Sequence, residues 1–268
     1  LASVHHICSL TKMAGQERSF RTTAIILKRR DFGEADRMLT ILTPRHGKVD
    51  VLAKGARKLT SPKTGHVELF TRADMLIHTG RDFGLVAQAE MTAPHVPLRE
   101  DLTRGAYAAY IAELLDRFTS DTAEDDTSLL YALADETLAR ISEDSDPRLA
   151  VRYFEVRLLD LVGFRPELNL CIIGREQIQP TDQFFSYAQG GVICPQHAGR
   201  SQSSVPIPMM TLKLLRHMQR SPYHHVKSLD IPPALHDDAE RILLGYITFL
   251  LERRLQSVDF IRRVRRVE

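Results

Sequence analysis

The chain has 268 residues, of which 43% are hydrophobic and 26% charged, as in an ordinary globular protein with one or two cores. Its 36 Lys and Arg nearly balance its 34 Asp and Glu, so the net charge of +2 does not by itself indicate a partner. The densest apolar stretch, residues 242–251, is too short to span a bilayer. Three cysteines, Cys8, Cys171 and Cys194, argue against a disulfide framework and favour a reducing compartment such as the cytoplasm.

The start of the chain lacks the cationic region and the long apolar region of a secretory signal. We expect residues 1–18 to be a disordered leader, with residues 1–12 preceding the functional start.

Five short β-prone runs, separated by turns rich in Gly, Pro and Asp, follow the leader. They span residues 22–28, 38–43, 49–53, 73–78 and 85–90. Because no helix-length insert separates them, they suit a small barrel better than a β-α-β unit. The five-stranded OB-fold barrel is the natural candidate, and we assign it residues 19–92.

The apolar pattern takes the period of a helix from about residue 98. One helical face is predicted to carry Leu98, Leu102, Ala106, Tyr110, Leu114 and Phe118. Further helices are predicted over 127–141, 147–164, 208–221 and 232–255. Residues 164–206 interrupt this pattern and suggest a hairpin-like insert that turns at Gly190-Gly191. The sequence therefore predicts an α+β protein, with a helical domain over 93–258 and a basic tail over 259–268.

Charge is segregated along the chain although the total is almost neutral. Residues 21–90 carry 13 Lys and Arg against 8 Asp and Glu, whereas residues 91–160 carry 7 against 15. A basic barrel suggests a polyanionic partner, and cations on loops can hold phosphates without reading bases. We predict phosphate contacts from the strand connections, with the loop 54–63 as the strongest group: Arg29, Arg30, Arg37, Lys48, Lys54, Arg57, Lys58 and Lys63. The alternative is a solvated surface whose local net charge varies along the chain by chance.

Aromatic residues near these loops add a second candidate contact. Phe32, Phe70 and Phe83 could stack on bases, although each could equally be a packing side chain.

The common catalytic motifs for nucleotide hydrolysis, dinucleotide binding, zinc proteolysis and acyl transfer are missing from the sequence. We therefore predict a protein that is not an enzyme. One alternative is a metal-dependent nuclease that uses Asp36, Asp50 or the cluster Asp237–Glu240; salt bridges or helix-start positions explain the acids at 36 and 237–240 more simply. A second alternative is an interaction scaffold whose barrel binds a protein.

Three segments resemble one known family. The stretch TTAIILKRRDFGEADRMLTILTPRHGKVDVLAKGARK is similar to the N-terminal barrel of RecO, the bacterial recombination-mediator and DNA-repair family, with the matching positions Thr43, Gly47, Lys54, Gly55, Arg57 and Ser61. The stretches YFEVRLLDLVGFRPELNLC and GGVICPQH are similar to the segments around the family's zinc-binding insert. The resemblance covers roughly residues 18–255.

The resemblance implies an OB-fold, a helical domain and often a structural zinc ion. It also implies binding of single- and double-stranded DNA, annealing of complementary strands and a cytoplasmic, nucleoid-associated location. The implied partners are RecR and the acidic tail of single-stranded DNA-binding protein, which together help to load RecA.

The candidate metal site departs from the family pattern of paired CxxC motifs. Gly174 stands where a second Cys is expected, which leaves Cys171, Cys194 and His197 as ligands. Structural zinc needs four donors, and the fourth could be Glu176, Asp182 or His217. Because the set is incomplete, the sequence favours a relic insert without metal, held by packing of Phe184, Phe185, Tyr187 and Ile193.

Overall fold

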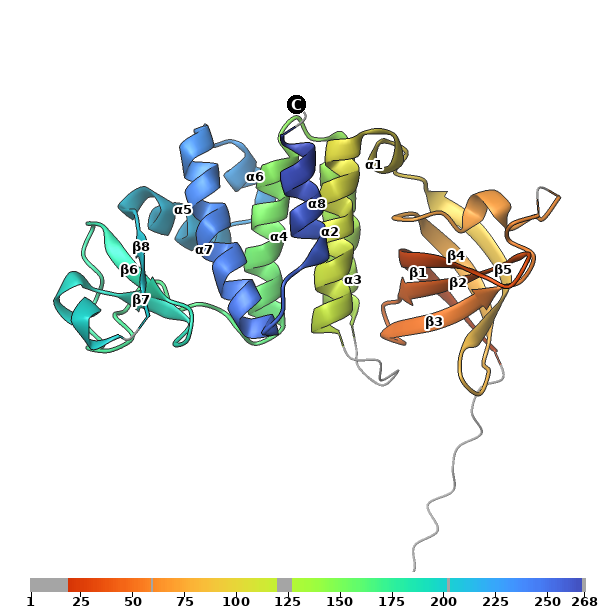
Figure 1. Cartoon of the computed structure of the whole chain (residues 1–268), viewed down its shortest axis with the longest axis horizontal. Coiled ribbons are helices and arrows are strands. Elements are labelled where there is room, and N and C mark those ends of the chain that lie inside the picture. Colours follow the sequence, from red (N-terminus) through yellow and green to blue (C-terminus); the bar gives the residue numbers. More distant parts are fainter. Residues whose placement is uncertain (1–18, 59, 120–126, 202, 267–268) are drawn as a thin grey trace, which may run out of the picture.

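The computed structural model describes residues 19–58, 60–119, 127–201 and 203–266. A β-barrel lies at one end of the molecule, a bundle of helices occupies the middle, and a small β-containing insert lies at the other end (Figure 1). The predicted leader, residues 1–18, lies outside the described residues. None of the described helices combines the length and apolar character that crossing a membrane requires.

The barrel is formed by five strands, as predicted. They are β1 (Ser19–Phe32), β2 (Asp36–Leu42), β3 (Lys48–Ala53), β4 (Arg72–His78) and β5 (Gly84–Ala93). The sheet closes in the order β1-β2-β3-β5-β4, with a parallel pair between β3 and β5 and antiparallel pairs elsewhere. This is the OB-fold arrangement. Its interior is fully buried and includes Ile26, Leu39, Ile41, Val51, Ile77 and Val86. Each such side chain contributes about 1.5–3 kcal/mol on burial.

Several residues that carry the family resemblance build the turns of this barrel. Thr43 donates its hydroxyl to the carbonyl of Gly47 at 3.0 Å and accepts from the backbone N–H of His46 at 3.0 Å. Gly47 and Gly55 have φ angles of 62° and 68°, which a residue with a Cβ adopts at a cost. The backbone N–H of Gly55 donates to Asp36 at 2.7 Å. Asp36, one of the nuclease candidates, is thus a turn-stabilising group.

The helical domain begins with the short α1 (Pro97–Glu100), and α6 (Tyr223–Lys227) is also short. The longer helices are α2 (Leu102–Phe118), α3 (Ser128–Glu143), α4 (Pro147–Leu161), α5 (Met209–Arg220), α7 (Pro233–Leu251) and α8 (Gln256–Val264). Leu98 and Leu102 were predicted to share one helical face, but Leu102 is 60% exposed. The reason is a break at Asp101, which is extended and caps α2 by accepting from the N–H of Arg104.

The C-terminal end also differs from the sequence prediction. Residues 259–268 were expected to form a basic tail, yet Asp259 to Val264 belong to α8. Helix α8 buries Ile261 and Val264 and exposes Arg262 and Arg263, so its arginines are fixed on a helical face.

A buried ionic group lies in the helical core. Arg152 and Glu155 are 4% and 0% exposed and approach to 3.0 Å, and Tyr110 donates its hydroxyl to Glu155 at 2.5 Å. Burial raises the pKa of Glu155 to about 7 despite the opposing charge of Arg152.

The insert is a three-stranded sheet rather than a simple hairpin. Its strands β6 (Gln183–Ser186), β7 (Gly191–Ile193) and β8 (Val205–Ile207) are ordered β7-β6-β8. The turn between β6 and β7 lies at Gly190, whose φ of 64° suits the predicted Gly-Gly turn.

The barrel and the helical domain are joined by side-chain contacts as well as by the chain. Asp116 at the end of α2 accepts from Lys28 at 2.5 Å and from Lys48 at 3.2 Å, and Arg72 pairs with Asp135 at 2.5 Å. Thr127, before α3, donates to the carbonyl of Thr43 at 2.6 Å. Burial alone would raise the pKa of Asp116, but the hydrogen bonds and charges of Lys28 and Lys48 outweigh it and lower the pKa.

Candidate nucleic-acid interface

The eight predicted phosphate contacts separate into two groups in the structure. Five of them already have partners. Arg29 and Arg37 both pair with Glu68, and Lys48 pairs with Asp116. Lys63 donates to the carbonyl of Val86 at 2.9 Å, and Arg57 lies 3.5 Å from Asp31. The sequence did not show these pairs, because Glu68 and Asp116 are distant along the chain from the cations that they meet.

The other three cations are exposed. Arg30, Lys54 and Lys58 make no ion pair or side-chain hydrogen bond among the residues that the structure describes. Arg57 lies between these two groups. It pairs with Asp31, but both side chains are exposed, Arg57 at 38% and Asp31 at 61%. Exposed pairs of this kind contribute about 0–1 kcal/mol, so a phosphate can replace the carboxylate at little cost.

We use the term barrel tip for the β1–β2 turn (33–35), the loop 54–63 and the β4–β5 turn (79–83). Arg57 ties the first two together, since its backbone N–H donates to Ala35 at 2.9 Å and its guanidinium to Gly33 at 3.3 Å. Phe32 and Phe83 flank the tip as an edge-to-face pair with centroids 6.3 Å apart, 42% and 38% exposed. Phe70, by contrast, is 7% exposed and packs with the helical core. Of the three candidate stacking residues, two are therefore available on the surface.

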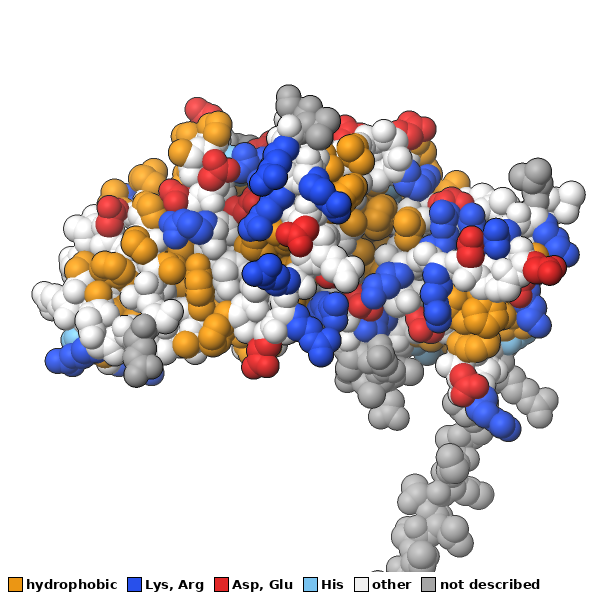
Figure 2. All heavy atoms as spheres, in the orientation of Figure 1, with side chains coloured by type: hydrophobic (Ala, Val, Ile, Leu, Met, Phe, Trp, Pro, Cys, Tyr) orange, Lys and Arg blue, Asp and Glu red, His pale blue; other side chains and the backbone are white. Residues whose placement is uncertain are grey.

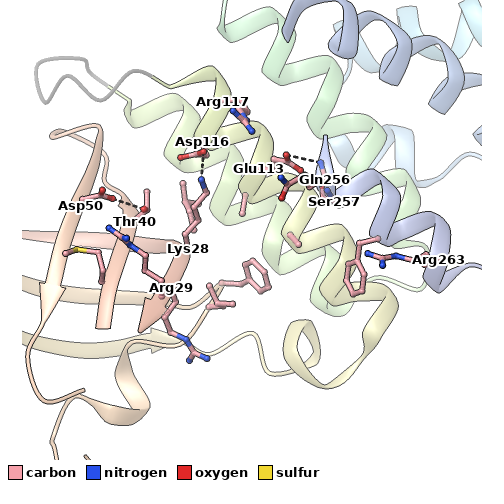
Figure 3. A pocket seen from close by; sticks show the side chains of 18 residues that line it. Lys28, Arg29, Thr40, Asp50, Glu113, Asp116, Arg117, Gln256, Ser257 and Arg263 are labelled. Atoms are coloured by element: carbon pink, nitrogen blue, oxygen red, sulfur yellow. Dashed lines mark hydrogen bonds and ion pairs between the residues drawn. The ribbon is translucent and has the colours of Figure 1, made fainter. Parts of the chain in front are cut away.

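A cavity of about 840 Å³ lies between the barrel and the helical domain, and we call it the interdomain groove (Figure 3). The barrel contributes Lys28, Arg29 and Arg30 from β1, Met38 and Thr40 from β2, and Asp50 from β3. The helical domain contributes residues of α2 and α8, including Glu113, Arg117, Phe260 and Arg263. In OB-folds, the face of strands 2 and 3 is the usual binding face. Here that face forms one wall of the groove.

Two exposed arginines of the groove, Arg117 and Arg263, were not predicted from the sequence. They lie on the helical wall, opposite Lys28 and Arg29 (Figure 3). Arg117 was hidden in the most acidic third of the chain, and Arg263 was interpreted as part of a tail. The helical period of α8, which places Arg262 and Arg263 beside the buried Ile261 and Val264, is the signal that could have identified the second one.

The surface around the groove is basic with an apolar floor. Figure 2 shows Lys and Arg side chains on the facing parts of the barrel and the helices, with hydrophobic surface between them. The acidic side chains of the groove already accept hydrogen bonds or form ion pairs. Glu113 accepts from the backbone N–H of Gln256 at 3.1 Å and of Ser257 at 2.9 Å, and so caps α8.

The insert brings together a second cluster of functional groups. Ligand atoms of Cys171, Glu176, Cys194 and His197 all lie within 4.8 Å of one another. Of the three possible fourth donors, the structure selects Glu176. Asp182 instead accepts from the backbone N–H of Met209 at 2.9 Å, and His217 contacts Ser221 at 3.2 Å.

The Glu176 carboxylate occupies the place where the family pattern has a cysteine. A Cβ added at Gly174 would lie 2.0 Å from a carboxylate oxygen of Glu176 and 2.3 Å from the ring of His197. The four residues therefore fit a closed four-donor site, which the sequence alone left incomplete.

Backbone groups also prepare Cys171 to act as a ligand. Burial raises the pKa of its thiol, but N–H groups of Gly174 and Cys194, each 3.5 Å from the sulfur, outweigh this and lower the pKa. The thiolate is the form that binds metal.

The acids of the alternative nuclease site are dispersed among separate ion pairs. Asp237 pairs with Arg148, Asp238 with Arg241, and Glu240 with Arg265. They also lie beyond the first turn of α7, so the interpretation of these acids as helix-start residues was wrong. Asp50, the other candidate, accepts from Thr40 at 2.7 Å.

A closed five-stranded barrel, an appended helical bundle and a small insert with a four-donor cluster define a particular class of OB-fold protein. Family profiles match both large parts. "Recombination protein O N terminal" matches residues 16–95, and "Recombination protein O C terminal" matches residues 99–259. The chain belongs to the RecO family of DNA repair proteins.

Individual relatives agree with these profiles. The DNA repair protein RecO of Roseiflexus sp. (strain RS-1) is 37% identical over 252 residues, which cover 94% of this chain and 88% of that protein. The protein of the same name from Desulforamulus reducens is 31% identical and covers 91% of this chain and 94% of its own length. One from Dehalococcoides mccartyi (strain CBDB1) is 30% identical, with coverage of 92% and 96%.

Proposed function

We propose that this protein is a DNA-binding recombination mediator that anneals complementary strands without making or breaking covalent bonds. The observation that carries the proposal is the set of unpaired cations at and beside the barrel tip, Arg30, Lys54 and Lys58, on a barrel of the OB-fold. These cations have no structural partner among the described residues, so their charge is available to phosphates.

The mechanism follows from electrostatics. Two DNA strands repel each other through their phosphates, and a protein that neutralises phosphates on both strands lowers that repulsion. Exposed lysines and arginines exchange partners easily, so complementary segments can pair while they remain bound. Phe32 and Phe83 offer apolar faces on which unpaired bases can stack before pairing.

An annealing assay with dye-labelled complementary oligonucleotides tests this proposal. We expect the protein to accelerate pairing, and the double variant Lys54→Glu and Lys58→Glu to lose most of the acceleration. A matched control is Lys213→Glu with Arg220→Glu, which changes the same charge on exposed positions of α5. Equal loss in both variants would contradict a local role of the tip. Cleavage of DNA with Mg²⁺ that persists through extensive purification would favour the nuclease instead.

We also infer that the helical domain receives the acidic tail of single-stranded DNA-binding protein, and that RecR is a further partner in loading RecA, as the family resemblance implies. A cavity of about 580 Å³ between α7 and α8 supports the tail site. Leu244, Leu255 and Val258 line it, with Arg241, Arg254 and Arg262 around them. The acids Asp237, Glu240 and Asp259 also line it, and each of them pairs with an arginine. Arg254 makes no ion pair among the described residues, so an apolar pocket beside this cation suits an acidic peptide that carries apolar residues.

Titration of a labelled tail peptide tests this site. We expect Arg254→Glu to lower the affinity for the peptide by about tenfold, since charge complementarity across such contacts contributes about 1 kcal/mol or more. Arg200→Glu, an exposed change on the insert, is the control. Unchanged peptide affinity in Arg254→Glu would place the tail elsewhere.

For the insert, we propose that Cys171, Glu176, Cys194 and His197 hold a structural zinc ion. The position of Glu176 in the space beside Gly174 favours this over the relic interpretation. A bound zinc ion would cross-link the segment 171–176 to the segment 194–197 and so stabilise the insert.

Metal analysis of purified protein is the direct measurement. We expect about one zinc per chain in the wild type, and loss of most of it in Cys194→Ser and in Glu176→Gln. Asp182→Asn is a matched carboxylate control that should keep its zinc. Metal-free wild-type protein purified without chelators would return the insert to the relic interpretation.

A further inference from the structure

The interdomain groove has two walls, and the proposed function uses only the barrel side. We propose that a single strand of DNA lies in this groove, with Arg117 of α2 and Arg263 of α8 holding its phosphates opposite the barrel. This inference rests on the proposed function, because it extends the same DNA-binding surface onto the helical domain.

The charges of the groove favour a polyanion. Five cations line it, Lys28, Arg29, Arg30, Arg117 and Arg263, against the three acids Asp50, Glu113 and Asp116. Two of those acids are already satisfied. Glu113 caps α8 through three hydrogen bonds, and Asp116 pairs with Lys28 and Lys48.

The free cations of the groove lie on both walls. Arg30 on β1 and Arg117 and Arg263 on the helices are exposed and make no ion pair within the part of the chain that the structure describes. Cations on both sides of a groove can hold successive phosphates of one strand while its bases face the lining between them.

The apolar part of the groove suits unpaired bases. The partly exposed Leu69, Ala109 and Phe260 line it, above the buried Met38, Phe70 and Ala112. Phe260 is half-buried and stands beside Arg263 in the chain, so an aromatic side chain and a phosphate-binding group share one helix. Aromatic contacts of this kind hold bases of any sequence.

The dimensions select a single strand over a duplex. A cavity of about 840 Å³ is in the range that encloses a drug-sized molecule, which corresponds to a few nucleotides. A duplex keeps its bases stacked inside and presents only its backbone and groove edges, so it cannot reach the apolar lining between the two walls.

An acidic peptide with apolar residues is the competing occupant, because its chemistry is partly the same. The groove favours nucleic acid because its barrel wall is built from β1, β2 and β3, and strands 2 and 3 form the usual oligonucleotide face of this fold.

The experiment measures the affinity of the full chain for an oligo-dT strand and for a duplex of equal length, by fluorescence anisotropy over a range of salt. The groove variant is Arg117→Glu with Arg263→Glu, and Arg117→Gln with Arg263→Gln is a milder version in case reversal disturbs folding. The control is Lys213→Glu with Arg220→Glu at the far end of the helical domain (Figure 1). The barrel variant is Lys54→Glu with Lys58→Glu.

We expect the groove variant to lose about tenfold or more in single-strand affinity. Its slope of log K against log salt should shrink by about 1.4, because two phosphate contacts are removed at about 0.7 each. Duplex binding should change less than about twofold, and the control should bind both ligands as the wild type does.

Two results would overturn the groove inference and leave the proposed function intact. One is an unchanged single-strand affinity in the groove variant while the barrel variant is weakened. The other is an equal loss of affinity for the single strand and for the duplex, which would indicate a general loss of positive electrostatic potential. If the groove variant loses affinity for an acidic phenylalanine-containing peptide but keeps its affinity for oligo-dT, the groove is a peptide site. If wild-type protein shows no salt-dependent DNA binding, the proposed function itself fails.

Discussion

The cations at the barrel tip and those at the junction between the barrel and the helical domain belong to the same basic segment but have different surroundings. At the junction, Lys28, Lys48 and Arg72 each meet an acid of the helical domain. At the tip, Lys54 and Lys58 meet none among the described residues. A basic cluster in a sequence can therefore contain cations that join two domains and cations that are free for a ligand. The acids that distinguish the two kinds come from distant segments.

The buried pair in the helical core is the extreme case of a structural charge and gives the largest expected effect. Glu155→Ala would leave Arg152 with one remaining acid, Glu240, 3.7 Å away, in a buried position. We expect a loss of about 3–5 kcal/mol in the free energy of unfolding at pH 8. Urea denaturation measures it. The double variant Arg152→Met with Glu155→Leu should recover much of this loss, and failure to do so would show that packing rather than charge is responsible.

The pH dependence of stability distinguishes this buried acid from exposed ones. The pKa of Glu155 is raised by burial from 4.5 to about 7. Between these values the folded chain binds a proton that the unfolded chain releases. The contribution of Glu155 to the free energy of unfolding should therefore decrease as pH rises from about 4.5 to 7 and be constant above.

Glu155→Gln isolates this contribution, because a neutral side chain does not titrate. We expect the stability difference between wild type and Glu155→Gln to change by about 1–3 kcal/mol over that pH range. Parallel pH profiles of the two proteins would show that Glu155 titrates at its ordinary pKa.

The junction should respond in stability more than in DNA binding. Lys48→Met removes a cation that is 9% exposed and keeps its apolar stem. We expect a loss of about 1 kcal/mol, since Asp116 retains Lys28 as partner. Oligonucleotide affinity measured in the same preparation should stay within about twofold. A large loss of affinity with unchanged stability would reassign Lys48 to the DNA-binding group.

The tip should show the opposite behaviour and gives the smallest effect on stability. Lys54→Gln with Lys58→Gln should change the free energy of unfolding by less than about 0.5 kcal/mol. The salt slope of single-strand binding should nevertheless fall by about 1.4. Thermal denaturation and anisotropy on one sample check both statements, and a stability loss above 1 kcal/mol would mean that these lysines have partners in solution.

Local patterns were sufficient to predict the barrel and most of the helical domain. Period-two runs bounded by Gly and Pro identified the five strands, and the helical period identified most helices, because both signals are set by neighbours along the chain. The error at Leu102 has a local cause too, since Asp101 favours a cap over continuing the helix.

The candidate sites could be predicted only in part, because they depend on residues brought together from far apart. The pairing of Lys48 with Asp116 and the position of Glu176 in the Cys–His cluster have no signature in spacing alone. Arg117 and Arg263 are 146 positions apart in numbering and share a cavity only because α2 and α8 pack together.

Closure of the barrel has a consequence for how other polypeptides can attach to it. Each of its five strands has a strand neighbour on both sides, although β3 and β5 pair only at Val51–Gly84 and Leu52–Leu85, so the sheet presents little free edge for an incoming β-strand. Recognition of a protein at the barrel should then rely mainly on side chains. In the insert, β8 has β6 as its one paired strand in the described sheet, which makes that small domain the better template for strand addition.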